Sequence, residues 1–88
     1  MPLKDYMVID PYAKAIQYTG DNYNEIKALF GDLVKKKSAD GFEFKEYTDE
    51  FNFCEPGDYI VVQKNTGEAA VFEEEQFLRD FKERIQND

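Results

Sequence analysis

The sequence predicts an α+β fold, with an antiparallel sheet of about four to six short strands and two helices packed on one face of that sheet. Two segments, at residues 22–30 and 73–85, place apolar side chains at helical spacing. Between them, short apolar segments are separated by Asp-Gly, Pro-Gly and Asn-Thr-Gly, which are typical of tight turns. The predicted order is β-α-β-β-β-β-α. Because 88 residues provide one small core, we expect a single domain at residues 12–88, preceded by an N-terminal arm of residues 1–11.

The first strand is predicted directly after the N-terminal arm. Residues 12–18 alternate loosely, with Ala13 and Ala15 on one face and Ile16 on the other. Within the arm, the apolar residues 6–9 offer a further strand at the edge of the sheet.

The first helix is predicted over residues 22–30. Asn22 and Glu25 have the spacing of a capping box, in which side chains at the start of a helix bond to its free N–H groups. Gly31 stands where a left-handed C-terminal cap is expected. The residues predicted to share the buried face are Tyr23, Ile26, Leu29 and Phe30.

The middle of the chain predicts a hairpin and one more short strand. Residues 33–37 and 42–47 flank a turn at residues 38–41 that ends in Asp-Gly. The hairpin places Phe42 and Phe44 on one face, and residues 51–53 repeat the same Phe-x-Phe alternation.

A second hairpin follows the Pro56-Gly57 turn. Residues 59–63 are apolar on both faces, which predicts a strand inside the sheet rather than at its edge. Residues 64–67 predict a type I turn with Gly67 left-handed, as in a three-residue hairpin loop with a bulge. Residues 69–72 are then expected to return antiparallel.

The last helix is predicted to begin at the three acidic residues 73–75, since carboxylates are stabilised at the positive end of a helix dipole. Two exposed ion pairs are expected four residues apart, Glu75 with Arg79 and Asp80 with Arg84. The buried stripe is predicted to consist of Phe77, Leu78, Phe81 and Ile85.

The composition is strongly acidic, with a formal net charge of −8. Such a surface repels phosphate groups, so we expect no direct binding to nucleic acid or to anionic membranes, and it suits a partner with a basic surface. One cysteine and no histidine exclude an internal disulfide and the usual zinc sites. No stretch approaches the roughly 20 apolar residues of a membrane span, and we expect a soluble protein of the cytoplasm.

The residues that could carry catalysis are few. Without a histidine partner, Ser38 and Cys54 are poor nucleophiles, and Cys54 is interpreted as a small core residue. No acidic spacing matches a calcium-binding loop, so neither a metal nor a cofactor is expected. The basic residues 35–37 are interpreted as lysines that protect a hairpin edge from aggregation. The sequence therefore predicts no enzymatic activity.

The predicted binding residues combine acids and tyrosines. Two acidic pairs lie near the turns at either end of the strand at residues 51–53, and this placement would allow them to converge. Tyrosines beside acidic groups are good anchors at protein interfaces. The candidate binding residues are Asp49, Glu50, Glu55, Asp58, Tyr59 and Tyr47.

Two stretches carry a resemblance to a known group of proteins. AIQYTGDNYNEIKALFG, at residues 15–31, and PGDYIVVQKNTGEAAVFEEEQF, at residues 56–77, resemble a group of small phage and prophage proteins of uncharacterised function. Members of the group pair A-(I/V)-Q-(W/Y)-T-G-(D/N)-N with a later P-G-D-(Y/W)-I-V. The sequence departs from this pattern at Tyr18, where Trp is common. The resemblance implies a phage or mobile-element origin and carries over no catalytic residue.

Charge and resemblance together favour a non-enzymatic accessory protein of a phage or prophage. The first hypothesis is an inhibitor that binds a basic host protein in the host cytoplasm, for example a CRISPR or other defence nuclease, and that imitates nucleic acid. The alternatives are a sponge that binds a small ligand such as a cyclic nucleotide, and a component of the virion or its assembly. Formation of a homodimer is left open.

Overall fold

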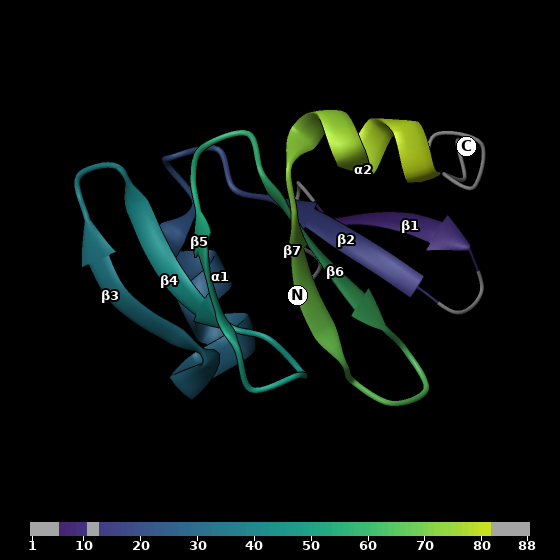
Figure 1. The fold of residues 1–88 in the computed structure, drawn as a ribbon, viewed down its shortest axis with the longest axis horizontal. Helices are drawn as coiled ribbons and strands as arrows, with labels where there is room; N and C mark the ends of the chain where they lie inside the picture. Colours follow the sequence, from purple (N-terminus) through teal and green to yellow (C-terminus); the bar gives the residue numbers. More distant parts are fainter. Residues whose placement is uncertain (1–5, 11–12, 82–88) are drawn as a thin grey trace.

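The computed structural model describes residues 6–10 and 13–81, and side chains are described from residue 13 onward. Figure 1 shows two sheets side by side, with the first helix behind the three-stranded sheet on the left and the last helix across the four-stranded sheet on the right. The elements follow one another as β1 (Tyr6–Asp10), β2 (Ala13–Gln17), α1 (Tyr23–Phe30), the 3-10 turn η1 (Gly31–Leu33), β3 (Val34–Ser38), β4 (Gly41–Lys45), β5 (Phe51–Cys54), β6 (Tyr59–Gln63), β7 (Ala69–Phe72) and α2 (Glu74–Phe81).

The strands form a four-stranded sheet of order β1-β2-β6-β7 and a three-stranded sheet of order β3-β4-β5. Every neighbouring pair is antiparallel. The predicted α+β class with antiparallel pairing is confirmed, and β1 occupies the edge position offered for residues 6–9. The strands divide between two sheets because α1 and η1 carry the chain away from β2. β3 therefore begins a new sheet, and β6 returns to pair with β2.

The strand β6 lies between β2 and β7, as its apolar sequence predicts. Its side chains alternate between two cores on opposite faces of the four-stranded sheet. Ile60 belongs to one core, whereas Tyr59 and Val61 belong to the other.

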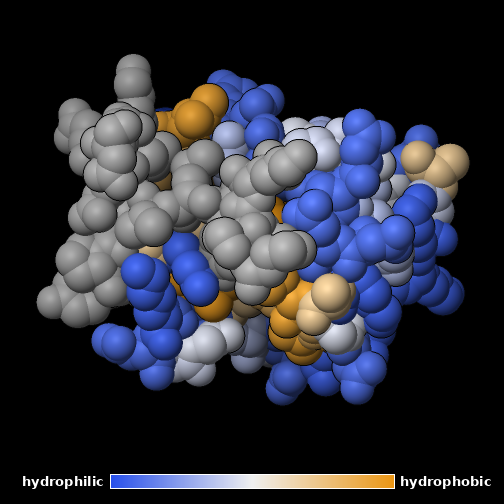
Figure 2. Space-filling view, turned by 180° about the vertical axis from the view of Figure 1, so that it is seen from behind, coloured by the Kyte–Doolittle hydropathy of each residue, from blue (hydrophilic) through white to orange (hydrophobic). Residues whose placement is uncertain are grey.

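The larger core lies between α1, the inner face of the three-stranded sheet and one face of the four-stranded sheet. Its aromatic rings meet edge to face, with centroids 5.6 Å apart for Tyr23 and Phe42 and 5.3 Å apart for Phe30 and Phe44. In the rear view of Figure 2, the surface of the described residues is mostly hydrophilic, with small hydrophobic areas. The buried members are Ile16, Tyr18, Ile26, Val34, Phe42, Phe44, Cys54, Ile60 and Ala69.

The smaller core lies under α2 on the opposite face of the four-stranded sheet. The ring of Phe77 stacks on that of Tyr59 with centroids 3.8 Å apart, and Phe72 meets Phe81 edge to face at 5.2 Å. The packing of both helices on one face is therefore not confirmed, because α1 and α2 belong to different cores. The sequence of β6 explains this, since both of its faces are apolar and each needs a cover.

The start of α1 differs from the predicted capping box. The helix begins after Asn22, but the side chain of Asn22 makes no hydrogen bond to the first turn. Its Oδ1 accepts the N–H of Thr19 at 2.9 Å, and its Nδ2 donates to the carbonyl of Gln17 at 2.8 Å. The capping-box prediction is wrong because the preceding loop uses both ends of this amide. At the other end of α1, Gly31 has a positive φ of 55°, but its ψ of −120° lies outside the left-handed helical region, so the predicted left-handed cap is not formed.

The helix α2 buries Phe77 and Phe81 as predicted, but Leu78 remains 42% exposed. Arg79 lies 3.6 Å from the carboxylate of its neighbour Asp80. The predicted contributions of Arg84 and Ile85 lie outside the described residues.

The β6–β7 hairpin has Gly67 at φ 75°, as predicted. The backbone N–H of Gln63 donates to the carbonyl of Glu68 at 2.8 Å, so the loop consists of residues 64–67. These are the predicted turn residues, but they form a four-residue loop and not the predicted three-residue type.

Candidate functional site

The two sheets are joined by a short segment after β4. One carboxylate oxygen of Glu46 accepts the N–H of Val71 at 2.6 Å, and the other accepts the side-chain amide of Asn52 at 2.6 Å. The N–H of Tyr47 donates to the carbonyl of Ala69 at 3.1 Å. These bonds use backbone groups at the edge of β7, so β5 and β7 are held side by side and that edge is occupied.

The two predicted acidic pairs do not converge. Asp49 and Glu50 precede β5, whereas Glu55 and Asp58 follow it, and four extended residues span roughly 13 Å. Asp49 is exposed, has φ 69°, and pairs with Lys45 at 3.6 Å. An ion pair this exposed contributes little to stability.

The two predicted tyrosines have opposite environments. Tyr59 is only 6% exposed and stacks on Phe77, so this candidate binding residue does not lie at the surface. Burial, together with the carboxylate of Glu74, raises the pKa of its hydroxyl. Tyr47 is 59% exposed and remains available for contact. The difference arises because Tyr59 alternates toward α2 in a central strand, whereas Tyr47 follows the end of β4.

Glu55 and Asp58 line a cleft of about 620 Å³ between the β5–β6 turn and the start of α2. The turn is well fixed, since the N–H of Glu55 donates to the Asp58 carboxylate and the N–H of Asp58 donates to the Glu55 carbonyl, both at 2.9 Å. Gln17 joins the two walls, with its amide donating to the carbonyl of Gly57 at 3.0 Å and to the carboxylate of Glu74 at 3.2 Å. We refer to this region as the acidic cleft, whose five carboxylates belong to Glu55, Asp58, Glu73, Glu74 and Glu75.

The electrostatics of the acidic cleft are those of crowded like charges. Burial raises the pKa of Asp58, the carboxylates of Glu55, Glu73 and Glu74 raise it further, and the hydrogen bond from the Glu55 N–H opposes the rise. A cationic group that entered the cleft would relieve this repulsion. Across the described residues, no group of three or more acidic or cysteine side chains is arranged to hold a metal ion.

Cys54 lies beneath this region and is fully buried. Burial raises the pKa of its thiol to about 12, and the carboxylates of Asp58 and Glu55 add to the rise. A thiol with this pKa stays protonated at neutral pH and is a poor nucleophile. The interpretation of Cys54 as a core residue is confirmed.

The contribution of residues 73–75 to the acidic cleft was not predicted, because their acidity was explained by the helix dipole. The signal that could have found it is the register of the second hairpin. Tyr59 pairs with Phe72, so the residues just outside this pair, Asp58 and Glu73, are brought to the same end of the sheet.

No protein-family model matches the chain, and searches of curated proteins and of solved structures find no match either. Among the described residues, no helix has the length and apolar character needed to cross a membrane.

Proposed function

We propose that this protein acts by binding a protein partner with a basic surface, without catalysing a reaction, and that the acidic cleft is the main contact. The observation that carries the proposal is the convergence of five carboxylates from two separate segments of a chain with net charge −8. Complementary charge speeds the encounter of two proteins and selects among partners.

The chemistry of the chain supports binding over catalysis. The sequence has no histidine to serve as a general base. Its single thiol is buried and protonated at neutral pH. A cation from a partner would instead find the Asp58 carboxylate partly desolvated and repelled by its neighbours, so pairing replaces an unfavourable interaction with a favourable one.

The finer form of the proposal is an inhibitor of a host defence protein, such as a nuclease, in which the carboxylates take the place of nucleic-acid phosphates. Its support is the acidic cleft together with the sequence resemblance to small phage and prophage proteins. The sponge for a cyclic nucleotide draws no support from this cleft, whose described lining includes no basic residue to hold a phosphate. A role in the virion or its assembly stays a separate alternative.

The test is a pull-down from a host lysate at low and high salt, with captured proteins identified by mass spectrometry. We expect a basic partner that is retained at low salt and released at high salt, because exposed charges are screened by ions. The variant Glu55→Gln/Glu73→Gln/Glu75→Gln should lose this partner. The matched control, Asp32→Asn/Asp40→Asn/Glu43→Gln, removes the same charge from exposed or half-exposed positions outside the cleft and should keep it. A complex that is insensitive to salt and to the first variant would refute the proposal.

A further inference from the structure

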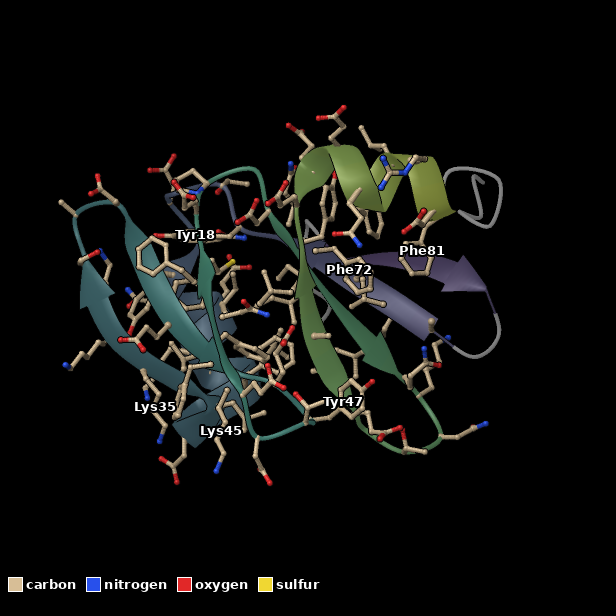
Figure 3. The ribbon with its side chains drawn as sticks, in the orientation of Figure 1. Tyr18, Lys35, Lys45, Tyr47, Phe72 and Phe81 are labelled. Carbon is tan, nitrogen blue, oxygen red and sulfur yellow. The ribbon has the colours of Figure 1, made fainter. Side chains whose placement is uncertain are left out.

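A second pocket, of about 420 Å³, shares no lining residue with the acidic cleft. It opens on the face of the four-stranded sheet that α2 covers. We call it the Tyr47 pocket. Figure 3 shows Phe72 and Phe81 next to each other below α2 and Tyr47 beside the far end of β7. The floor is hollow where the small side chain of Ala70 faces Val61 of the neighbouring strand. The lining residues are Tyr47, Val61, Gln63, Asn65, Thr66, Glu68, Ala69, Ala70, Phe72 and Phe81.

The aromatic wall of this pocket is exposed, and the backbone that carries it is held in place. Tyr47 is 59% exposed, yet its backbone N–H is bonded to β7 and the preceding Glu46 carboxylate is anchored by Val71 and Asn52. Because this stretch of backbone is already ordered, contact with the exposed ring costs little further backbone entropy, and exposed tyrosines are common at binding hot spots.

The polar wall is similarly fixed. Glu68 is the one charged residue among the described residues that line the pocket. Its Oε1 accepts the hydroxyl of Thr66 at 3.0 Å, and the same hydroxyl oxygen accepts the Glu68 N–H at 3.2 Å. The carboxylate is thus oriented by the loop, and its Oε2 atom has bonding capacity for a donor from outside.

We propose that the Tyr47 pocket binds the side chain of an arginine presented by the partner, which rests on the proposed function and adds a second contact to it. The planar guanidinium group stacks on an aromatic ring and pairs with a carboxylate at the same time. The apolar stem of arginine suits the Ala70 and Phe72 floor. A phosphate-bearing ligand is disfavoured here, because the only charge in the lining is the negative one of Glu68.

The test is a two-dimensional NMR titration of the intact chain with N-acetyl-arginine-N-methylamide as the probe and the corresponding lysine amide as the comparison. We expect saturable shifts at Tyr47, Glu68 and Ala70, and binding about fivefold tighter for the arginine probe, since only arginine combines stacking with a planar pairing geometry. Tyr47→Ala and Glu68→Gln should each weaken the binding by about fivefold, whereas Tyr47→Phe, which retains the ring, should preserve it.

A filling variant and a cleft variant complete the test. Ala70→Ile fills the floor with a residue that suits a strand, so it should abolish the shifts while the spectrum stays dispersed. If that variant does not fold, the weaker arginine binding expected for Glu68→Gln serves as the test. Glu68 is exposed, so its substitution should leave the fold intact. The triple variant Glu55→Gln/Glu73→Gln/Glu75→Gln should leave the shifts at Tyr47 unchanged. Shifts confined to the acidic cleft, or no saturable shift at all, would overturn this inference, while salt-dependent capture of a partner through the cleft would still support the proposed function.

Discussion

The two sheets have similar alternating sequences but differ in how many of their faces are buried. Both faces of the four-stranded sheet contact a core, whereas the three-stranded sheet buries only its inner face. The register explains the contrast, since Phe42 pairs with Cys54 and Glu43 pairs with Phe53. Phe42 therefore points into the core with 0% exposure, and Phe53 stays 42% exposed beside a charged neighbour. A Phe-x-Phe pattern thus identifies a strand, but the pairing partner decides which face is buried.

The largest expected effect compares these two phenylalanines. Phe42→Ala removes a ring that contacts both Tyr18 and Tyr23, so it should lower the free energy of unfolding by about 3–5 kcal/mol. Phe53→Ala, on the outer face, should lower it by less than about 1 kcal/mol. Urea denaturation of the two variants measures both values. Equal losses would show that the outer face of β5 is as well packed as the inner face of β4.

A second prediction concerns the close approach of β4 and β5. A Cβ atom at Gly41 would clash with the carbonyl oxygen of Cys54 and would crowd the Phe53 ring. Because a backbone atom cannot swing aside, Gly41→Ala should cost about 2–3 kcal/mol. At Gly67 no atom lies near the added methyl group, and only the positive φ opposes the change. Gly67→Ala should therefore cost about 1 kcal/mol. Thermal unfolding of the two variants tests this order, and a larger loss at Gly67 would contradict it.

Breaking the link between the sheets should lower the free energy of unfolding less than a core substitution does, but more than the loss of a surface ion pair. Glu46→Ala leaves the N–H of Val71 without its partner in a partly buried place, so we expect a loss of about 1–2 kcal/mol. Glu46→Gln retains one acceptor oxygen and should lose less. Exchange of the Val71 amide hydrogen with solvent gives a local reading of the same bond. Unchanged exchange in Glu46→Ala would show that the carboxylate does not hold β7.

Local sequence patterns predicted the individual elements well, because turns and periodicity act over a few residues. Gly67 in the β6–β7 turn and the apolar run of β6 illustrate this, since each was identified from its own neighbours in the sequence. The division into two sheets was not predictable in this way, because it depends on whether β6 pairs with β2 or with β5, which lies much closer in the chain. In the acidic cleft, Glu55 and Asp58 were predicted as binding residues, but near Asp49 and Glu50, and the wall that they actually face required the placement of α2.

The smallest expected effect lies at the acidic cleft and is a dependence on pH. Because the folded-state pKa of Asp58 is raised above its ordinary value of about 3.8, the stability contributed by its protonated form is fully present below that value and is lost as the pH rises through the folded-state pKa. At neutral pH the ionised side chain therefore lowers the stability of the fold slightly. Asp58→Asn should raise the unfolding temperature slightly, because it removes the charge while its amide oxygen still accepts the Glu55 N–H.

The gain from Asp58→Asn should shrink toward zero as the pH falls toward 3.8, and it stays modest because solvent screens a group this exposed. Asp58→Ala is the control, because it removes the acceptor of the Glu55 N–H and should destabilise the protein at every pH. Thermal unfolding between neutral and acidic pH measures the three proteins together. A gain that grew on acidification, or a loss at neutral pH, would show that the Asp58 carboxylate is stabilised by the turn more than it is opposed by its acidic neighbours. The cleft would then be a structural feature of the β5–β6 turn rather than a surface prepared for a cation.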